Sequence, residues 1–161
     1  MILNKIGSKQ NHAILSILIV FSVMTISCAS APYAQKEGDV MKLVQLINDG
    51  KVGEKEGVTR TPFILDSETL YLESDTSRMW KNLEEATFRM SKANFISSEF
   101  TGENSYKLFA DTYDMKNYFA KYTGKDTSVV TLATGEGRYY LLLDRKVKGY
   151  PRIQGLKGPV E

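Results

Sequence analysis

The chain has 161 residues, of which 42% are hydrophobic, and this is enough for one domain with a buried core. It carries 21 basic and 19 acidic side chains, and two of the bases, Lys5 and Lys9, precede residue 28. From residue 28 onward the chain therefore carries 19 charges of each sign. A neutral domain lacks the positive surface that nucleic-acid binding needs, so we do not expect nucleic acid as a partner.

Residues 1–27 have the order of a secretory signal. Lys5 and Lys9 lie in a basic head, and residues 13–27, "AILSILIVFSVMTIS", form an apolar run that ends in small residues. The run is shorter than the about 20 apolar residues that cross a bilayer. We expect residues 1–27 to be a signal peptide that directs export, and the alternative is a retained N-terminal membrane anchor.

The apolar run ends in Thr25-Ile26-Ser27-Cys28, which resembles the lipobox of bacterial lipoproteins. The resemblance implies cleavage before Cys28 and a lipid on its thiol, with palmitate among the acyl chains. It also implies attachment to the cell membrane or outer membrane, with the domain in the periplasm or at the cell surface. Thr25 stands where the lipobox usually has leucine. The residue after the cysteine is Ala29 rather than aspartate. In this respect the sequence resembles lipoproteins that are sent to an outer membrane.

The sequence leaves a second processing route open. Ordinary signal peptidase would cut after the small-x-small pattern that ends at Ala31, although Pro32 then follows the cut, or after Ala34. Either cut would give a soluble secreted or periplasmic protein without a lipid.

Export with cleavage before Cys28 also removes reactive side chains. His12 is the only histidine and Cys28 the only cysteine, so the domain keeps neither type beyond its first residue. This excludes Ser-His-Asp and Cys-His nucleophilic sites and zinc sites of histidine and cysteine. The acidic residues lack the spacing of a calcium-binding loop. We assign no catalytic residue, no metal ligand and no cofactor.

Residues 28–36 are predicted to be the lipidated N-terminus and a tether, and residues 37–161 a single domain. The first helix follows, because Val40, Leu43, Val44 and Ile47 recur at helical spacing. We expect Asp39 to cap this helix and Gly50 to end it. Residues 51–58 are polar and interrupted by glycine, which predicts a loop or at most one turn.

The remaining elements alternate between strands and helices. A hairpin is expected within residues 61–74 around Asp66-Ser67-Glu68, and an amphipathic helix follows a cap at Ser74 or Asp75 and runs to Met90. Two strands are expected within residues 94–111, joined at residues 102–104. A short helix over residues 113–123, strands over 128–134 and 138–146, and a last strand over 150–158 complete the order. Residues 139–143 are apolar on both faces, which predicts a central strand.

This order predicts an α+β fold, with a curved, mainly antiparallel sheet packed on two to three helices. The opening "LVQLINDGKV" before "TPFILD", and the ending "GYPRIQGLKG", resemble the nuclear-transport-factor-2-like, or cystatin-like, superfamily. The resemblance implies a sheet that wraps its helices into a cone, whose open end is a pocket.

For function we expect a non-catalytic binding domain for a small apolar ligand or for an envelope partner. Trp80, Tyr139 and Tyr140 are the candidate ligand-binding residues, although each occupies a position where a core aromatic is also expected. One alternative is an enzyme of the cone type, similar to the isomerases and dehydratases of that superfamily, which would work through Asp66, Asp144, Tyr139 and Tyr140. Another alternative is a structural component of the envelope.

Overall fold

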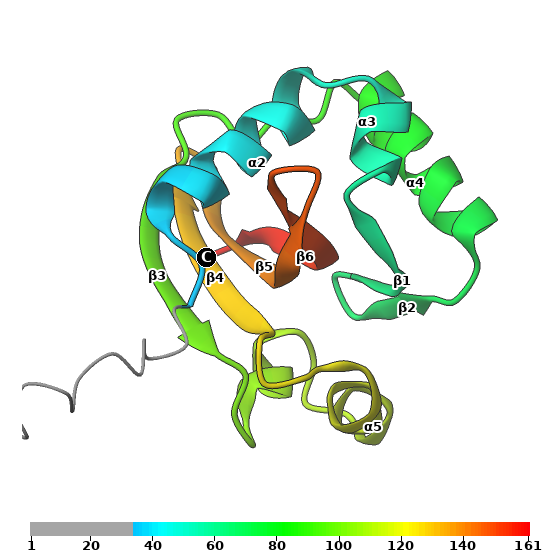
Figure 1. The fold of residues 1–161 in the computed structure, drawn as a ribbon, viewed down its shortest axis with the longest axis vertical. Coiled ribbons are helices and arrows are strands. Elements are labelled where there is room, and N and C mark those ends of the chain that lie inside the picture. The colour runs from blue at the N-terminus through cyan, green and yellow to red at the C-terminus, as the bar shows by residue number, and fades with distance from the viewer. Residues whose placement is uncertain (1–33) are drawn as a thin grey trace, which may run out of the picture. The chain divides into compact units, whose positions relative to one another are not determined.

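The computed structural model of the chain describes residues 34–161 (Figure 1). The predicted signal peptide and Cys28 lie outside the described residues. The helices are α2 (Glu37–Asp49), α3 (Val52–Glu56), α4 (Glu73–Glu85), the 3₁₀ helix η1 (Ser105–Leu108) and α5 (Tyr113–Tyr122). The strands are β1 (Thr59–Leu65), β2 (Glu68–Leu70), β3 (Asn94–Phe100), β4 (Ser128–Thr134), β5 (Gly137–Val147) and β6 (Tyr150–Val160).

The six strands form one mixed sheet in the order β2-β1-β6-β5-β4-β3. Each neighbouring pair is antiparallel except β1 and β6, which are parallel. The sheet is not closed into a barrel, and Figure 1 shows strands β3 to β5 curving around the side on which α2 lies. The predicted α+β class with a mainly antiparallel sheet is confirmed, and β5 has the interior position expected of it.

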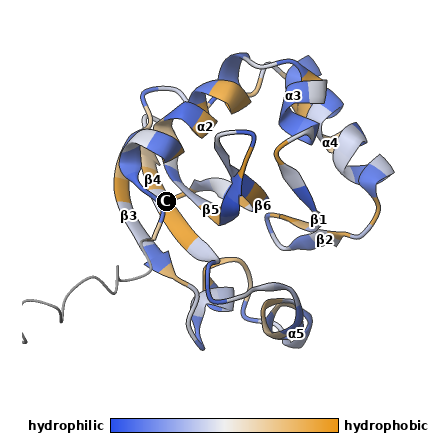
Figure 2. Cartoon of the chain, viewed as in Figure 1, coloured by the Kyte–Doolittle hydropathy of each residue, from blue (hydrophilic) through white to orange (hydrophobic). Residues whose placement is uncertain are grey.

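One face of the sheet is covered by α2 and α4, which supply much of the larger core. Residues at helical spacing on α2 (Val40, Leu43, Val44 and Ile47) are buried against β4, β5 and β6. Figure 2 shows hydrophobic and hydrophilic stretches alternating along this helix. The predicted cap at Asp39 is wrong: the helix begins at Glu37 after Lys36, and Asp39 lies in its first turn, where its carboxylate pairs with Lys146 of β5.

Helix α4 buries Met79 and Trp80 in the same core, as the amphipathic pattern predicts. The helix ends at Glu85, however, and Thr87 has a φ of 55°, a left-handed conformation that the α-helix cannot continue. Met90 is still buried, because the chain folds back and Asn48 accepts a hydrogen bond of 2.9 Å from the Met90 amide. The prediction of a helix up to Met90 is therefore wrong beyond Glu85.

The other face of the sheet is covered by η1 and α5. Tyr106 and Phe109 of this segment pack with Met115, Tyr118 and Phe119 over strands β1, β4 and β5. The second strand expected within residues 94–111 is thus wrong, and a 3₁₀ helix stands there. Tyr106 and Phe109 are three residues apart, and this spacing places both side chains on one side of a 3₁₀ turn. The alternation of apolar and polar residues, by which a strand is predicted, does not detect this spacing.

The predicted hairpin around Asp66 is confirmed, and a second sharp hairpin joins the strands β5 and β6. Asp66 has a φ of 54° between β1 and β2, and Lys148 and Gly149 have φ values of 52° and 86° between β5 and β6. The loop expected over residues 51–58 contains the short helix α3. Residues 34–161 form one compact unit, and both hydrophobic cores are made of its own side chains.

Candidate functional site

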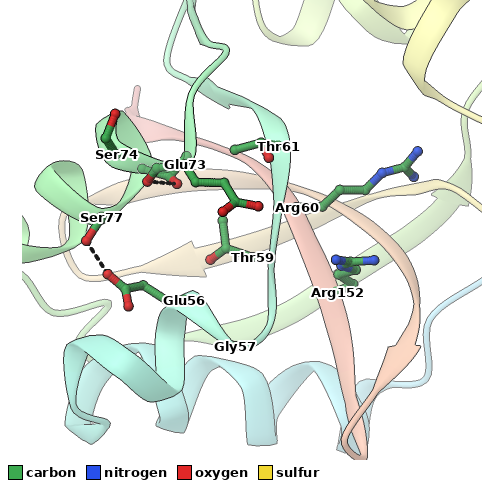
Figure 3. A pocket seen from close by; sticks show the side chains of 10 residues that line it. Glu56, Gly57, Thr59, Arg60, Thr61, Glu73, Ser74, Ser77 and Arg152 are labelled. Carbon is green, nitrogen blue, oxygen red and sulfur yellow. Dashed lines mark hydrogen bonds between the residues drawn. The ribbon is translucent and has the colours of Figure 1, made fainter.

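A polar cleft lies along the first residues of β1, between α3 and the start of α4 (Figure 3). Its volume is ≈ 760 Å³. Hydroxyl and charged side chains dominate the lining, which consists of Glu56, Gly57, Thr59, Arg60, Thr61, Glu73, Ser74, Thr76, Ser77 and Arg152. We take this cleft as the candidate functional site.

The cleft exists because β1 departs from its neighbour β6. Thr59 pairs with Ile153 and Ile64 with Gly155, so five steps along β1 correspond to two along β6. The extra residues form a bulge, and bulges of this kind redirect side chains out of the ladder. Strand β2 pairs only with residues 63–65, which leaves the outer edge of residues 59–62 without a strand partner.

Two buried aromatic residues fix this bulge from opposite faces of the sheet. The Trp80 indole donates a hydrogen bond of 2.8 Å to the Thr59 hydroxyl, which donates one of 2.7 Å to the Lys55 carbonyl. On the other face the Tyr118 hydroxyl donates a hydrogen bond of 2.5 Å to the Pro62 carbonyl. Burial raises the pKa of Tyr118, which keeps the phenol neutral and able to donate. The cleft therefore has a rigid floor.

The basic groups of the cleft come from β1 and β6. Arg60 forms an ion pair with Asp144 of β5, across the intervening strand β6. Arg152 of β6 is the cross-strand neighbour of Asp144 and is exposed. Figure 3 shows Arg60 and Arg152 on one side of β1 and Glu73 on the other. The lining thus presents cationic and anionic groups to opposite sides of one strand.

The acidic groups come from the short helix α3 and from the first turn of α4, which flank β1. The Ser77 hydroxyl of α4 donates a hydrogen bond to the Glu56 carboxylate of α3, and this contact joins the two walls. The Thr76 hydroxyl donates one of 2.9 Å to the Glu73 carbonyl. Among the described residues, neither the Glu73 carboxylate nor the Arg152 guanidinium has an ion-pair or hydrogen-bond partner. These two groups are free to meet a ligand.

The structure does not bring the three predicted ligand-binding residues together. Trp80 is 0% exposed and packs edge-on against Phe63, with ring centroids 6.2 Å apart. Tyr139 is 1% exposed and packs against Phe88 on the same face. Tyr140 lies on the opposite face, in a shallow groove of ≈ 320 Å³ beside Ile96 and Leu108. Trp80 and Tyr139 thus occupy core positions, and Trp80 supports the cleft from below.

The four residues named for the alternative enzyme are also divided. Asp66 lies in the β1–β2 turn, where its carboxylate accepts a hydrogen bond of 3.1 Å from the Gly158 amide. Burial, together with the nearby carboxylates of Glu136 and Asp66, raises the pKa of Tyr139. Asp144 pairs with Arg60 toward the other end of β5, five residues beyond Tyr139. The two carboxylates thus lie toward opposite ends of β5, each held by its own partner.

Sequence reasoning missed the residues that line the cleft. A visible signal was present in "TRTPF", residues 59–63, because a threonine–arginine–threonine run before proline is too polar for a buried strand. It could indicate an exposed strand edge, but the contribution of Arg152 from a strand 92 positions later needs the tertiary structure. Glu73 likewise reaches the site only through the path of the β2–α4 connection.

The part of the chain that the structure describes holds no group of three or more histidine, cysteine or acidic side chains that could bind a metal ion. In the same residues, no helix is long and apolar enough to cross a membrane. Comparisons with protein-family models, curated proteins and solved structures gave no match to this chain.

Proposed function

We propose that the protein is an exported lipoprotein, attached to a membrane through a lipid on Cys28, whose α+β domain binds an envelope partner without catalysing a reaction. The basic head, the short apolar run and the lipobox-like Thr25-Ile26-Ser27-Cys28 support the export and the anchor. Support for one independent domain behind the anchor comes from the compact unit formed by residues 34–161.

The polar lining of the cleft is the observation that carries the binding role. The Arg152 guanidinium and the Glu73 carboxylate face solvent without partners among the described residues, on either side of β1 (Figure 3). A ligand with charges of both signs, such as a polar segment of another protein, complements these groups. A small apolar ligand has less support, because Trp80 and Tyr139, two of the three aromatic residues expected to hold it, lie in the core.

The resemblance to the cystatin-like superfamily is kept as part of the proposal. The curvature of the sheet around α2 and α4 supports it, since that arrangement is what the resemblance implies. The space between the curved sheet and these helices is filled by side chains, including Phe63, Trp80 and Leu141, all 0% exposed. A filled interior favours a binding or structural role over the alternative enzyme, which needs a pocket around its carboxylate.

The anchor is tested by radiolabelled palmitate incorporation in cells that express the wild type or Cys28→Ala. We expect label in the wild type and none in the variant. Equal labelling of the two, or label in neither, contradicts the anchor.

The binding role is tested by photo-crosslinking in intact cells. A photoreactive phenylalanine replaces Ser74 in the cleft or, as a matched control, Asn117, which is also exposed and lies on α5. We expect a discrete adduct with an envelope component at position 74 only, and its loss when Arg152→Glu is added. The same adducts at both positions, or none at position 74, contradict binding in the cleft.

A further inference from the structure

The described chain begins at the end of the sheet where β5 turns into β6. The Gln35 amide donates a hydrogen bond of 3.1 Å to the Asp144 carbonyl of β5. Three residues into α2 the Asp39 carboxylate pairs with Lys146 at 2.5 Å. These two contacts hold the start of the domain against the last residues of β5.

The chain between this point and Cys28 is short. Cys28 lies six residues before Ala34, and an extended chain covers at most about 3.6 Å per residue, or about 22 Å in all. If Cys28 carries a lipid, as the proposed function states, the membrane surface lies within that reach of the β5–β6 end. This inference therefore rests on the proposed anchor.

The same end of the domain carries a cluster of basic side chains. We define the hairpin-end surface as the charged residues at the β5–β6 hairpin, at the start of α2 and on the segment before β4, apart from Arg152 and the Arg60–Asp144 pair, which belong to the cleft. Its bases are Lys36, Lys125, Arg145, Lys146 and Lys148, and its acids are Glu37, Asp39 and Asp126. The surface thus holds five of the domain's 19 bases but three of its 19 acids.

The contacts within the hairpin-end surface leave its positive charge on the outside. Asp39 pairs with Lys146 and Asp126 with Arg145, so two acids are already compensated. Two other bases (Lys125 and Lys148) are exposed and have no ion-pair partner among the described residues. The adjacent helix α3 and its N-cap do not change the net charge of this end, since their two bases, Lys51 and Lys55, are matched by two acids, Glu54 and Glu56.

We propose that the hairpin-end surface faces the membrane to which Cys28 is attached and contacts its anionic phospholipid headgroups. An anionic bilayer attracts basic side chains over roughly one Debye length, about 10 Å at 0.1 M salt. The short tether keeps this surface within range of such contact, and the attraction then orients the domain. The rest of the domain, with 14 bases and 16 acids by difference and with the cleft, turns toward the aqueous side.

The test uses the unlipidated segment 29–161, which holds both hydrophobic cores, and measures its co-sedimentation with lipid vesicles at 50 mM and 500 mM NaCl. One set of vesicles is phosphatidylcholine alone, and the other contains equal parts of phosphatidylglycerol and phosphatidylcholine. We compare the wild type with Lys125→Glu/Lys148→Glu. The control is Lys92→Glu/Arg138→Glu, which has the same net charge but lies at the opposite end of the sheet. Lys92 and Lys148 also share a positive φ, 53° and 52°.

We expect the wild type to bind the anionic vesicles at low salt and to lose this binding at high salt and on phosphatidylcholine. The hairpin-end variant should bind about tenfold or more weakly, while the control stays within about twofold of the wild type. Equal weakening of the two variants, equal binding to both vesicle types or no binding of the wild type overturns the proposal. Circular dichroism confirms folding, and if a variant is unfolded, the wild-type comparison of lipids and salt decides alone. Palmitate labelling reports separately on the anchor.

Discussion

Trp80 and Thr59 are joined by a hydrogen bond of 2.8 Å between the indole nitrogen and the threonine hydroxyl, at the boundary between the core and the cleft. The fully buried indole supports the first residue of β1, and the backbone of the next residues lines the candidate site. Trp80, which the sequence suggests as a ligand-binding residue, therefore does not line the cleft. It lies beneath the cleft and supports strand β1 through Thr59.

This contact predicts a measurable coupling. Trp80→Phe and Thr59→Val should each reduce the free energy of unfolding, the first by about 1–3 kcal/mol, since each removes a partner from a buried hydrogen bond. The double variant should lose about 1 kcal/mol less than the sum of the single losses. Urea unfolding of the four proteins gives this coupling energy. Strict additivity of the two changes would show that the hydrogen bond does not stabilise the fold.

Gly155 provides a test of the packing between β6 and the α5 side of the sheet. A Cβ atom at this position would lie 3.2 Å from the Cβ atoms of both Ile64 and Leu142. Since these atoms are fixed by the backbone, Gly155→Ala should cost about 1–3 kcal/mol of unfolding free energy. Gly38→Ala is the control, because nothing lies within 4 Å of its Cβ position in the first turn of α2, and helix propensity favours alanine. Equal stability of the two variants would contradict the close packing.

Tyr118 predicts a loss of stability at alkaline pH. Burial raises its pKa, so the folded protein keeps the phenolic proton more strongly than the unfolded chain does. Stability should be constant below the ordinary tyrosine pKa of about 10 and fall as the pH rises above it. Tyr118→Phe should be less stable than the wild type at pH 8, through loss of the bond to Pro62, yet show a shallower decline above pH 10. Urea unfolding at pH 8, 9.5 and 11 measures both effects, and an unchanged slope in the variant would refute the assignment.

The ion pair between Asp39 and Lys146 predicts a small loss of stability at acidic pH. The hydrogen bond from Lys146 and its positive charge lower the pKa of Asp39, so the folded state binds its proton less readily than the unfolded chain. The stability from this pair is present above the ordinary aspartate pKa of about 3.9 and is lost as the pH falls through the folded value. Asp39→Asn should lower the free energy of unfolding at pH 7 by less than about 1 kcal/mol, because the pair is partly solvated. At pH 2 the wild type and the variant should unfold at the same urea concentration, and a difference that persists there would argue against the ion pair as its cause.

The sequence predicts those helices and strands whose pattern of apolar residues lies within a single short segment. Helical spacing of Val40, Leu43, Val44 and Ile47 indicates α2, and the run from Tyr139 to Leu143 indicates an interior strand, since both patterns record which face is buried. The cleft is not predictable in this way, because it depends on how far β1 bulges away from β6. The segment 105–108 misleads for a related reason: Tyr106 within it and Phe109 directly after it pack with residues of α5, a tertiary contact that favours a 3₁₀ turn over a strand.

The central claim is that the protein is a lipoprotein anchored through Cys28, and the identity of the mature N-terminus tests it most directly. Intact-mass and N-terminal peptide mass spectrometry of the protein purified from membranes identifies the first residue and any group attached to it. The account predicts a chain that begins at Cys28, with a mass increased by a diacylglyceryl group on the thiol. A mature chain that begins at Pro32 or Gln35, or an unmodified Cys28, would contradict it.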